Sequence, residues 1–150
     1  MTHENHQQLR LKAGDLNAAV RSLRSALQRD MEVIHTQRQS AIETNVSDEI
    51  QRLNKQRDQL SMDLVALEDQ VATLERLARG GVRPGREADA LVYIDKLAQA
   101  FRLAVDDIKT RARSSLLMLE RLPAWEVESA RASVADADAA AALLKRVLDG

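Results

Sequence analysis

Residues 46–78 read VSDEIQRLNKQRDQLSMDLVALEDQVATLERLA, and this stretch decides the fold. Its apolar residues recur with alternating spacings of three and four, and the same pattern returns at residues 91–122. A seam held over several heptads is typical of a coiled coil. The first seam consists of Val46, Ile50, Leu53, Arg57, Leu60, Leu64, Leu67, Val71, Leu74 and Ala78. The second consists of Leu91, Ile94, Ala98, Phe101, Val105, Ile108, Ala112, Ser115, Leu119 and Leu122.

A segment that cannot remain helical separates the two seams. Residues 79–85 read RGGVRPG and hold three of the five glycines of the chain. An antiparallel fold at this loop pairs residues whose numbers sum to about 168, so Leu67 is expected to meet Phe101 and Leu60 to meet Ile108. We therefore predict an all-α fold, an antiparallel coiled-coil helical hairpin with additional N-terminal and C-terminal helices in one elongated bundle.

The pattern predicts a single domain over residues 1–150. Its helices are expected at about residues 9–43, 46–79, 87–121 and 124–148, with the hairpin loop at 80–85, and Pro123 ends the third helix. Two courses are open for residues 9–79, which either break near 44–47 or form one continuous helix with a shifted seam. We favour the continuous helix, because residues 44–47 contain no glycine or proline.

Composition excludes several classes of function. The chain has no cysteine, so disulfides and thiolate metal sites are impossible, and its net charge of −1 gives no strong attraction to nucleic acid or membranes. No apolar run approaches the ~18 residues of a membrane span. Only three aromatic residues are present, which argues against an enclosed ligand pocket. We expect a cytoplasmic protein that is not an enzyme and has no cofactor, metal or small-molecule substrate.

Two local motifs resemble sites but are better explained as polar surface. Glu32 and His35 have the Glu-x-x-His spacing of di-iron bundles, yet the motif occurs once and no further histidine follows. Lys109, Arg111 and Arg113 form a basic cluster that could hold phosphate. Acidic neighbours and the lack of an aromatic ladder favour a solvated face instead.

Apolar residues outside the two seams are candidates for partner binding. Before residue 46, one apolar stripe consists of Leu16, Leu23, Leu27 and Ile34. We predict that this stripe meets either a second copy of the chain or the last helix. Tyr93 and Trp125 are expected either to anchor partner contacts or to pack the last helix on the hairpin base. The last helix has its own seam of Val127, Ala130, Val134, Ala137, Ala141, Leu144 and Leu148. The candidate partner-binding residues are Leu16, Leu23, Leu27, Ile34, Tyr93, Trp125, Val134 and Leu144.

Arg57 is a charged residue on an otherwise apolar seam. If the last helix folds back at Pro123, residues that sum to about 246 lie level across that turn. Arg57, level with Ala112, would then lie near Asp136 and Asp138. Because a buried arginine needs a carboxylate or a route to water, we predict that one of these aspartates approaches Arg57, either within one chain or across a dimer.

Three functions remain open at this stage. The first is a non-catalytic coiled-coil scaffold or adaptor that acts through helix–helix protein interactions and forms homo-oligomers. The second, by architectural analogy alone, is a chaperone or stalk of a secretion, flagellar or phage assembly system. The third is a nucleic-acid-associated regulator that uses arginine-rich helix faces. We favour the first, because the seams demand protein partners while the charge balance gives nucleic acid little attraction.

Overall fold

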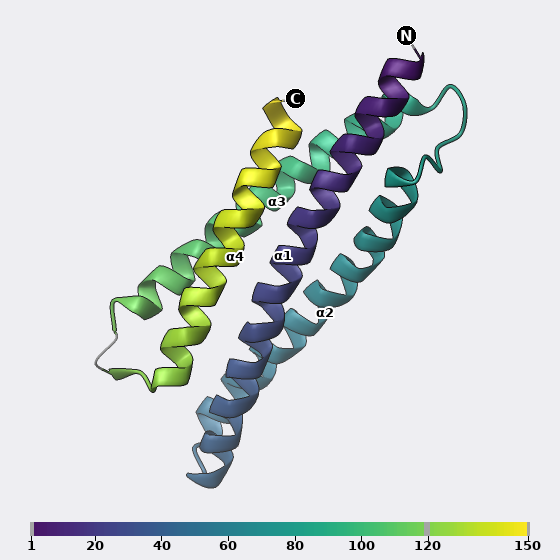
Figure 1. The fold of residues 1–150 in the computed structure, drawn as a ribbon. Helices are drawn as coiled ribbons and strands as arrows, with labels where there is room; N and C mark the ends of the chain where they lie inside the picture. Colours follow the sequence, from purple (N-terminus) through teal and green to yellow (C-terminus); the bar gives the residue numbers. More distant parts are fainter. Residues whose placement is uncertain (1, 119–120, 150) are drawn as a thin grey trace.

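Four long helices run alternately up and down the molecule (Figure 1). The computed structural model describes residues 2–118 and 121–149, with side chains from residue 4 onward. The helices are α1 (Thr2–Glu43), α2 (Ser47–Ala78), α3 (Glu87–Leu116) and α4 (Ala124–Asp149), and the described residues contain no strand. The predicted all-α, antiparallel helical bundle is confirmed.

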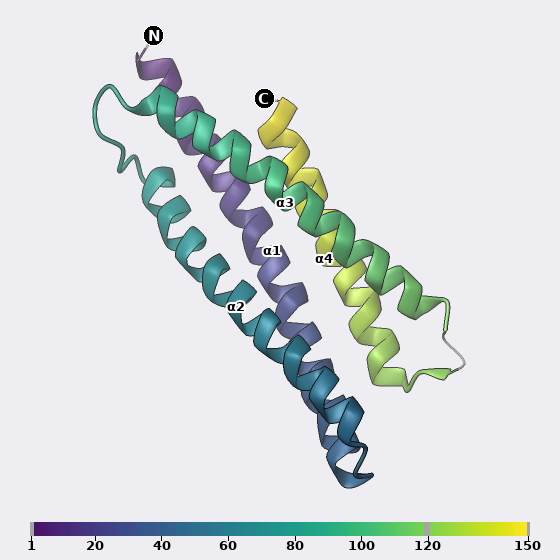
Figure 2. The same cartoon turned by 180° about the vertical axis from the view of Figure 1, so that it is seen from behind.

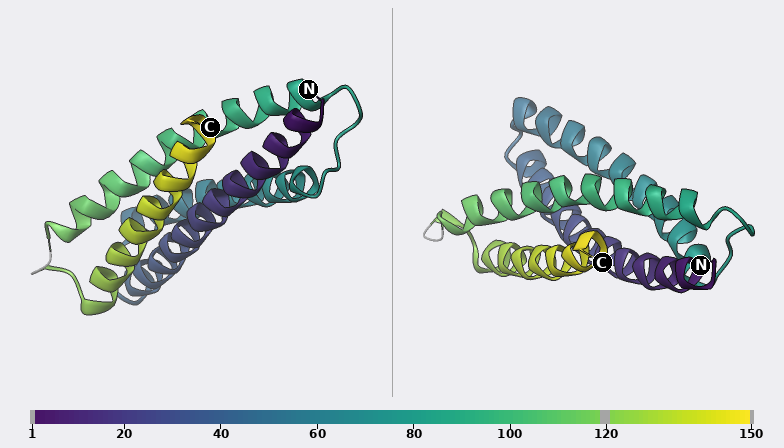
Figure 3. Two further views of the ribbon diagram at one scale, coloured as in Figure 1. Left: turned by 45° about the horizontal axis from the view of Figure 1, so that its top comes forward. Right: turned by 90° about the horizontal axis from the view of Figure 1, so that it is seen from above.

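Helix α1 lies at the centre of the bundle. It packs closely against α2 and α4 and, over a shorter stretch, against α3, while α3 also packs against α4. Helices α2 and α3 are not among the closely packed pairs. They diverge from the loop that joins them, and α1 is visible between them from behind (Figure 2). The view from above also shows α2 and α3 at an angle to one another (Figure 3).

The apolar stripe of α1 explains its central place. Leu9, Leu16, Val20 and Leu23 are all fully buried or nearly so. Small residues of the same stripe, Ala13, Ala19 and Ala26, are buried as well. Alanines widen the stripe without adding bulk, so neighbouring helices approach α1 from more than one side. The apolar stripe of α1 was expected to meet either a second copy of the chain or the last helix. It is covered within the chain, and α4 is one of the helices that cover it.

The prediction of one continuous helix over residues 9–79 is wrong. Asn45 adopts a positive φ of 57°, and the chain reverses there. The amide of Val46 donates to the carbonyl of Ala41, and the amide of Asn45 donates to that of Ile42, both at 3.1 Å. This pair of bonds is the Schellman motif that ends many helices, with asparagine in the place usually held by glycine. Asparagine tolerates the left-handed conformation, so no glycine is required.

The loop after α2 repeats the same arrangement with glycine. Gly80 has a φ of 82°, its amide donates to the Leu77 carbonyl, and the Gly81 amide donates to the Arg76 carbonyl at 2.9 Å. A side chain at Gly80 would also press on the imidazole of His6, which lies on α1. The predicted break at 80–85 is thus confirmed.

The expected direct seam between residues 46–78 and 91–122 is corrected. The hairpins of adjacent, closely packed helices are α1–α2 and α3–α4. Leu67, Phe101, Leu60 and Ile108 are all buried as predicted, but α1 is the main neighbour of α2. A heptad pattern reports which face of a helix is buried and leaves its neighbour undetermined, because apolar burial is not directional.

Two helix boundaries differ from the expected ones. Helix α1 begins at Thr2 rather than near residue 9, and Leu9 is fully buried. Helix α3 ends at Leu116 rather than near 121, and Leu117 is 88% exposed, so no apolar contact extends the helix. Leu119, a predicted seam residue, lies outside the described residues.

The predicted fold-back of the last helix is confirmed by an ion pair. Lys109 on α3 and Asp138 on α4 lie 2.6 Å apart, within one position of the expected register. The seam within α4 is corrected, because the buried face consists of Ala130, Ser133, Ala137, Ala140, Leu144 and Val147. Val134 is only half-buried.

We expect Asn45→Ala to lower the free energy of unfolding by about 1 kcal/mol, because a β-carbon without a local hydrogen-bonding group disfavours the left-handed conformation. Asn45→Gly should cause no loss. Urea unfolding followed by circular dichroism measures both. Equal stability of the alanine and glycine variants would contradict the assigned role of this turn.

Leu23→Ala is expected to cost about 2–5 kcal/mol, because it opens a cavity at the centre of the bundle. Leu103→Ala is a matched control, since Leu103 on α3 is 73% exposed. The control should change the free energy of unfolding by less than about 0.5 kcal/mol. Similar losses for both variants would show that α1 is not the packed centre.

Candidate functional site

A groove opens where α2 and α3 diverge, and all four helices contribute to its walls. Its volume is about 560 Å³. We call it the α2–α3 groove. Its lining consists of Leu27, Asp30, Val33, Ile34 and Gln37 from α1, Gln56, Gln59, Leu60 and Asp63 from α2, Asp107, Ile108, Arg111, Ala112 and Ser115 from α3, and Glu126, Ser129, Ala130 and Ser133 from α4.

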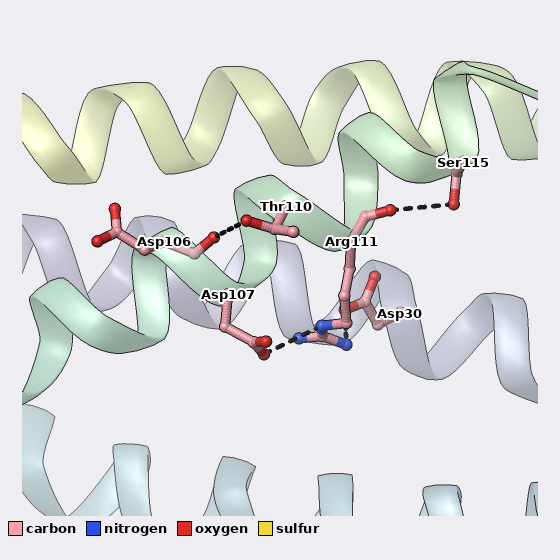
Figure 4. Close-up of polar contacts among 6 residues, drawn as sticks. All are labelled: Asp30, Asp106, Asp107, Thr110, Arg111 and Ser115. Atoms are coloured by element: carbon pink, nitrogen blue, oxygen red, sulfur yellow. Dashed lines mark hydrogen bonds and ion pairs between the residues drawn. The ribbon is translucent and has the colours of Figure 1, made fainter.

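An ion-pair network connects two walls of the groove (Figure 4). The guanidinium of Arg111 donates from Nε to Asp107 at 3.1 Å and from Nη1 to Asp30 at 3.5 Å. Asp107 belongs to the same helix, one turn away, whereas Asp30 belongs to α1. Arg111 therefore joins α3 to the central helix at the level of the groove.

Asp30 occupies a seam position of α1, three residues after Leu27 and four before Ile34. Burial raises the pKa of its carboxyl group, and the neighbouring carboxylate of Asp107 adds to this, while Arg111 and Arg29 act in the opposite direction. Desolvation is the largest of these effects, so the two arginines do not fully compensate for the loss of water. The site holds an acid whose surroundings disfavour its charge.

Ser133 is the second polar residue on a buried seam. It is 3% exposed, and its Oγ has no hydrogen-bond partner. It lines the groove with Asp30 and Ala130. A buried hydroxyl without a partner is unfavourable by about 1–3 kcal/mol. Ser133 is therefore a polar group that the folded chain leaves unsatisfied beside an acidic groove.

The remaining acids at the groove have only neutral partners. Gln37 donates to Glu126 at 3.3 Å, which links α1 to α4, and Gln59 donates to Asp63 at 3.1 Å within α2. Amide donors leave a carboxylate its full charge. Among the described lining residues Arg111 is the single cation, and two aspartates already bind it.

The structure separates the predicted partner-binding residues into two groups. The buried members are Leu16, Leu23, Leu27, Ile34 and Leu144, which correspond to core positions, and two of them, Leu27 and Ile34, also line the α2–α3 groove. The accessible members are Tyr93, at 41% exposed, Trp125, at 40%, and the half-buried Val134. Tyr93 and Trp125 lie near the starts of different helices, α3 and α4, so the structure does not bring them together.

The prediction for Arg57 is wrong within one chain. Its guanidinium lies 3.4 Å from Asp58, its neighbour in sequence, and its side chain is one-third exposed. Asp136 pairs with Arg29, and Asp138 pairs with Lys109. Because α2 packs on α1 and diverges from α3, Arg57 has a route to water and needs no buried carboxylate.

The Glu-x-x-His motif lies on the surface of α1. Glu32 and His35 are both exposed on α1, and no group of three or more potential metal ligands occurs among the described residues. Asp30, Asp63 and Ser133 were missed as site residues. A signal for one of them was present, since Asp30 interrupts the apolar stripe of α1 with a polar side chain. The seam expected in the last helix passed through Val134 and left Ser133 outside it.

No protein family, curated protein or solved structure matches the sequence. Within the described part of the chain, no helix combines the length and apolar character that crossing a membrane requires.

Asp30→Asn tests the electrostatics of the groove. Because the pKa of Asp30 is raised on folding, the native state holds this proton more tightly than the unfolded chain does. Stability should therefore fall as pH rises from the ordinary value of 3.8 through the folded-state pKa. At pH 7 the asparagine variant, which has no charge to desolvate, should melt at a higher temperature than the wild type. Its advantage should shrink when the pH is lowered below that ordinary value.

Asp69→Asn, at an exposed position of α2, is the matched control and should show no such pH-dependent difference. Melting temperatures at several pH values measure the effect. A lower melting temperature for Asp30→Asn at pH 7 would mean that the ion pair with Arg111 outweighs the cost of burial.

Proposed function

We propose that this chain is a non-catalytic helical scaffold or adaptor, and that it binds a helix of another protein in the α2–α3 groove. The observation that carries the proposal is the one-sided packing of α2. This helix of 32 residues packs closely on α1 alone, so one flank of it borders a groove instead of another helix. Helix-in-groove docking is a common mode of protein recognition.

The pairing of the basic residues supports a protein ligand over nucleic acid. Lys109 and Arg111, members of the basic cluster on α3, pair with aspartates. On α1, Arg24 pairs with Glu68 of α2 at 2.9 Å. Cations committed to internal carboxylates attract phosphate less, because the neighbouring negative charge offsets their field.

Burial of the α1 stripe removes the original reason to expect self-association. That reason was an apolar surface without a cover, and α1 is covered by the other three helices. The proposal therefore names a different protein as the partner, with the groove as its docking surface.

A photo-crosslinking amino acid placed in the full chain tests this function in cells that naturally contain the protein. At Gln59, on the groove wall, we expect a crosslinked species of one defined mass. At Val65, 64% exposed and on the face of α2 opposite the groove, we expect none. Mass spectrometry identifies the attached protein.

Two results would contradict the proposal. Crosslinked species at only twice the 16.7 kDa mass of the chain would identify a second copy as the occupant. Equal crosslinking from Gln59 and Val65 would show that partner proteins do not prefer the groove.

A further inference from the structure

The charges that line the α2–α3 groove are unbalanced. The acids are Asp30, Asp63, Asp107 and Glu126, and Arg111 is the one cation among the described lining residues. Four carboxylates against one guanidinium leave a formal charge of −3. Since the whole chain has a net charge of only −1, this local excess is a property of the groove. A ligand that complements it must be cationic.

A second, independent observation points to the same kind of ligand. The Oγ of Ser133 is buried without a partner and lines the same groove as Asp30. An ammonium or guanidinium group that enters the groove can donate hydrogen bonds to the oxygens of Asp30 and Ser133. Arg111 does not fill this role for Ser133, because its guanidinium donates to Asp30 and Asp107.

We propose that the α2–α3 groove receives one face of a cationic helix from a partner protein, with a lysine or arginine inserted between Asp30 and Ser133. Further cations on the same face of the partner meet Asp63, Asp107 and Glu126. This inference rests on the proposed function and adds the chemistry of the partner.

The shape of the groove favours a helix over an extended segment. All its walls are helices, and small residues, Ala112 and Ala130, allow close approach of another helix. The groove-side face of α3 continues upward through residues spaced three and four apart from Asp107, namely Ala104, Ala100, Leu97 and Tyr93. Tyr93, exposed on that face, extends the docking surface beyond the acids.

Fluorescence anisotropy with the purified full chain tests the proposal. The probe is a labelled alanine-rich peptide of about 20 residues, with lysines three and four apart on one helical face. We expect saturable binding. A peptide of the same length and charge in which prolines replace two central alanines, and which cannot form the helix, should bind about tenfold more weakly.

Two variants with the same change in net charge separate the groove from general attraction. The groove variant carries Asp63→Asn, Asp107→Asn and Glu126→Gln. The control carries Glu32→Gln, Asp58→Asn and Asp69→Asn, at exposed positions on the opposite faces of α1 and α2. The groove variant should weaken binding of the helical peptide about tenfold or more, and the control less than about threefold. Circular dichroism verifies that both remain folded.

Ser133→Ala tests the inserted cation. It removes a hydroxyl that has no partner in the free protein, so stability should not fall. Affinity for the lysine peptide should fall about fivefold or more, because a hydrogen bond to a charged group is lost. Unchanged affinity would overturn the assigned place of the cation.

Three other results would overturn the proposal. These are equal losses in the groove and control variants, equal binding of the proline peptide, and no binding of the lysine peptide. If Gln59 still crosslinks to a partner in cells while the lysine peptide fails, the cationic helix is wrong and the adaptor function stands. If neither is observed, both proposals fail.

Discussion

Burial of the apolar stripe of α1 is the constraint on which the rest of the structure depends. Leu9, Leu16 and Leu23 are almost completely removed from water, and three other helices share the task of covering them. Because α1 occupies the space between α2 and α3, these two helices cannot form the direct seam that their matching heptads suggest. The α2–α3 groove follows from this arrangement, since the two helices diverge on either side of a central one.

Local features of the fold could be predicted from the sequence to a large extent. The heptads at residues 46–78 and 91–122 predicted two long helices and their buried faces, and Gly80, Gly81 and Pro123 predicted the breaks. The pairing of helices could not be predicted, because each seam is equally satisfied by any apolar neighbour. The turn at Asn45 was missed for a similar reason. Asparagine is only one of several residues that tolerate a left-handed conformation, and the capping bonds that stabilise it come from backbone atoms.

The groove could be predicted only in part. Asp30 interrupts the apolar stripe of α1, which is visible in the sequence as a polar residue at a position where an apolar one is expected. Ser133 lies outside the predicted seam of the last helix, and only the packing of α4 places it on a buried face. That these two residues come to line one groove depends on how α1 and α4 pack, and no local pattern contains this information. Lys109 and Asp138 show the reverse case, in which a turn at Pro123 predicted the register and the ion pair confirmed it.

Polar residues on buried seams weaken a bundle that apolar residues would hold more firmly. An apolar side chain at position 30 or 133 would add burial, and replacing buried charged groups in this way is often stabilising. The chain instead keeps a carboxylate with a raised pKa and a hydroxyl without a partner on one groove. A partner that brings a cation to this place would supply the hydrogen bonds that the free chain lacks. The unfavourable features of the isolated protein and the chemistry of its proposed partner thus have one common explanation.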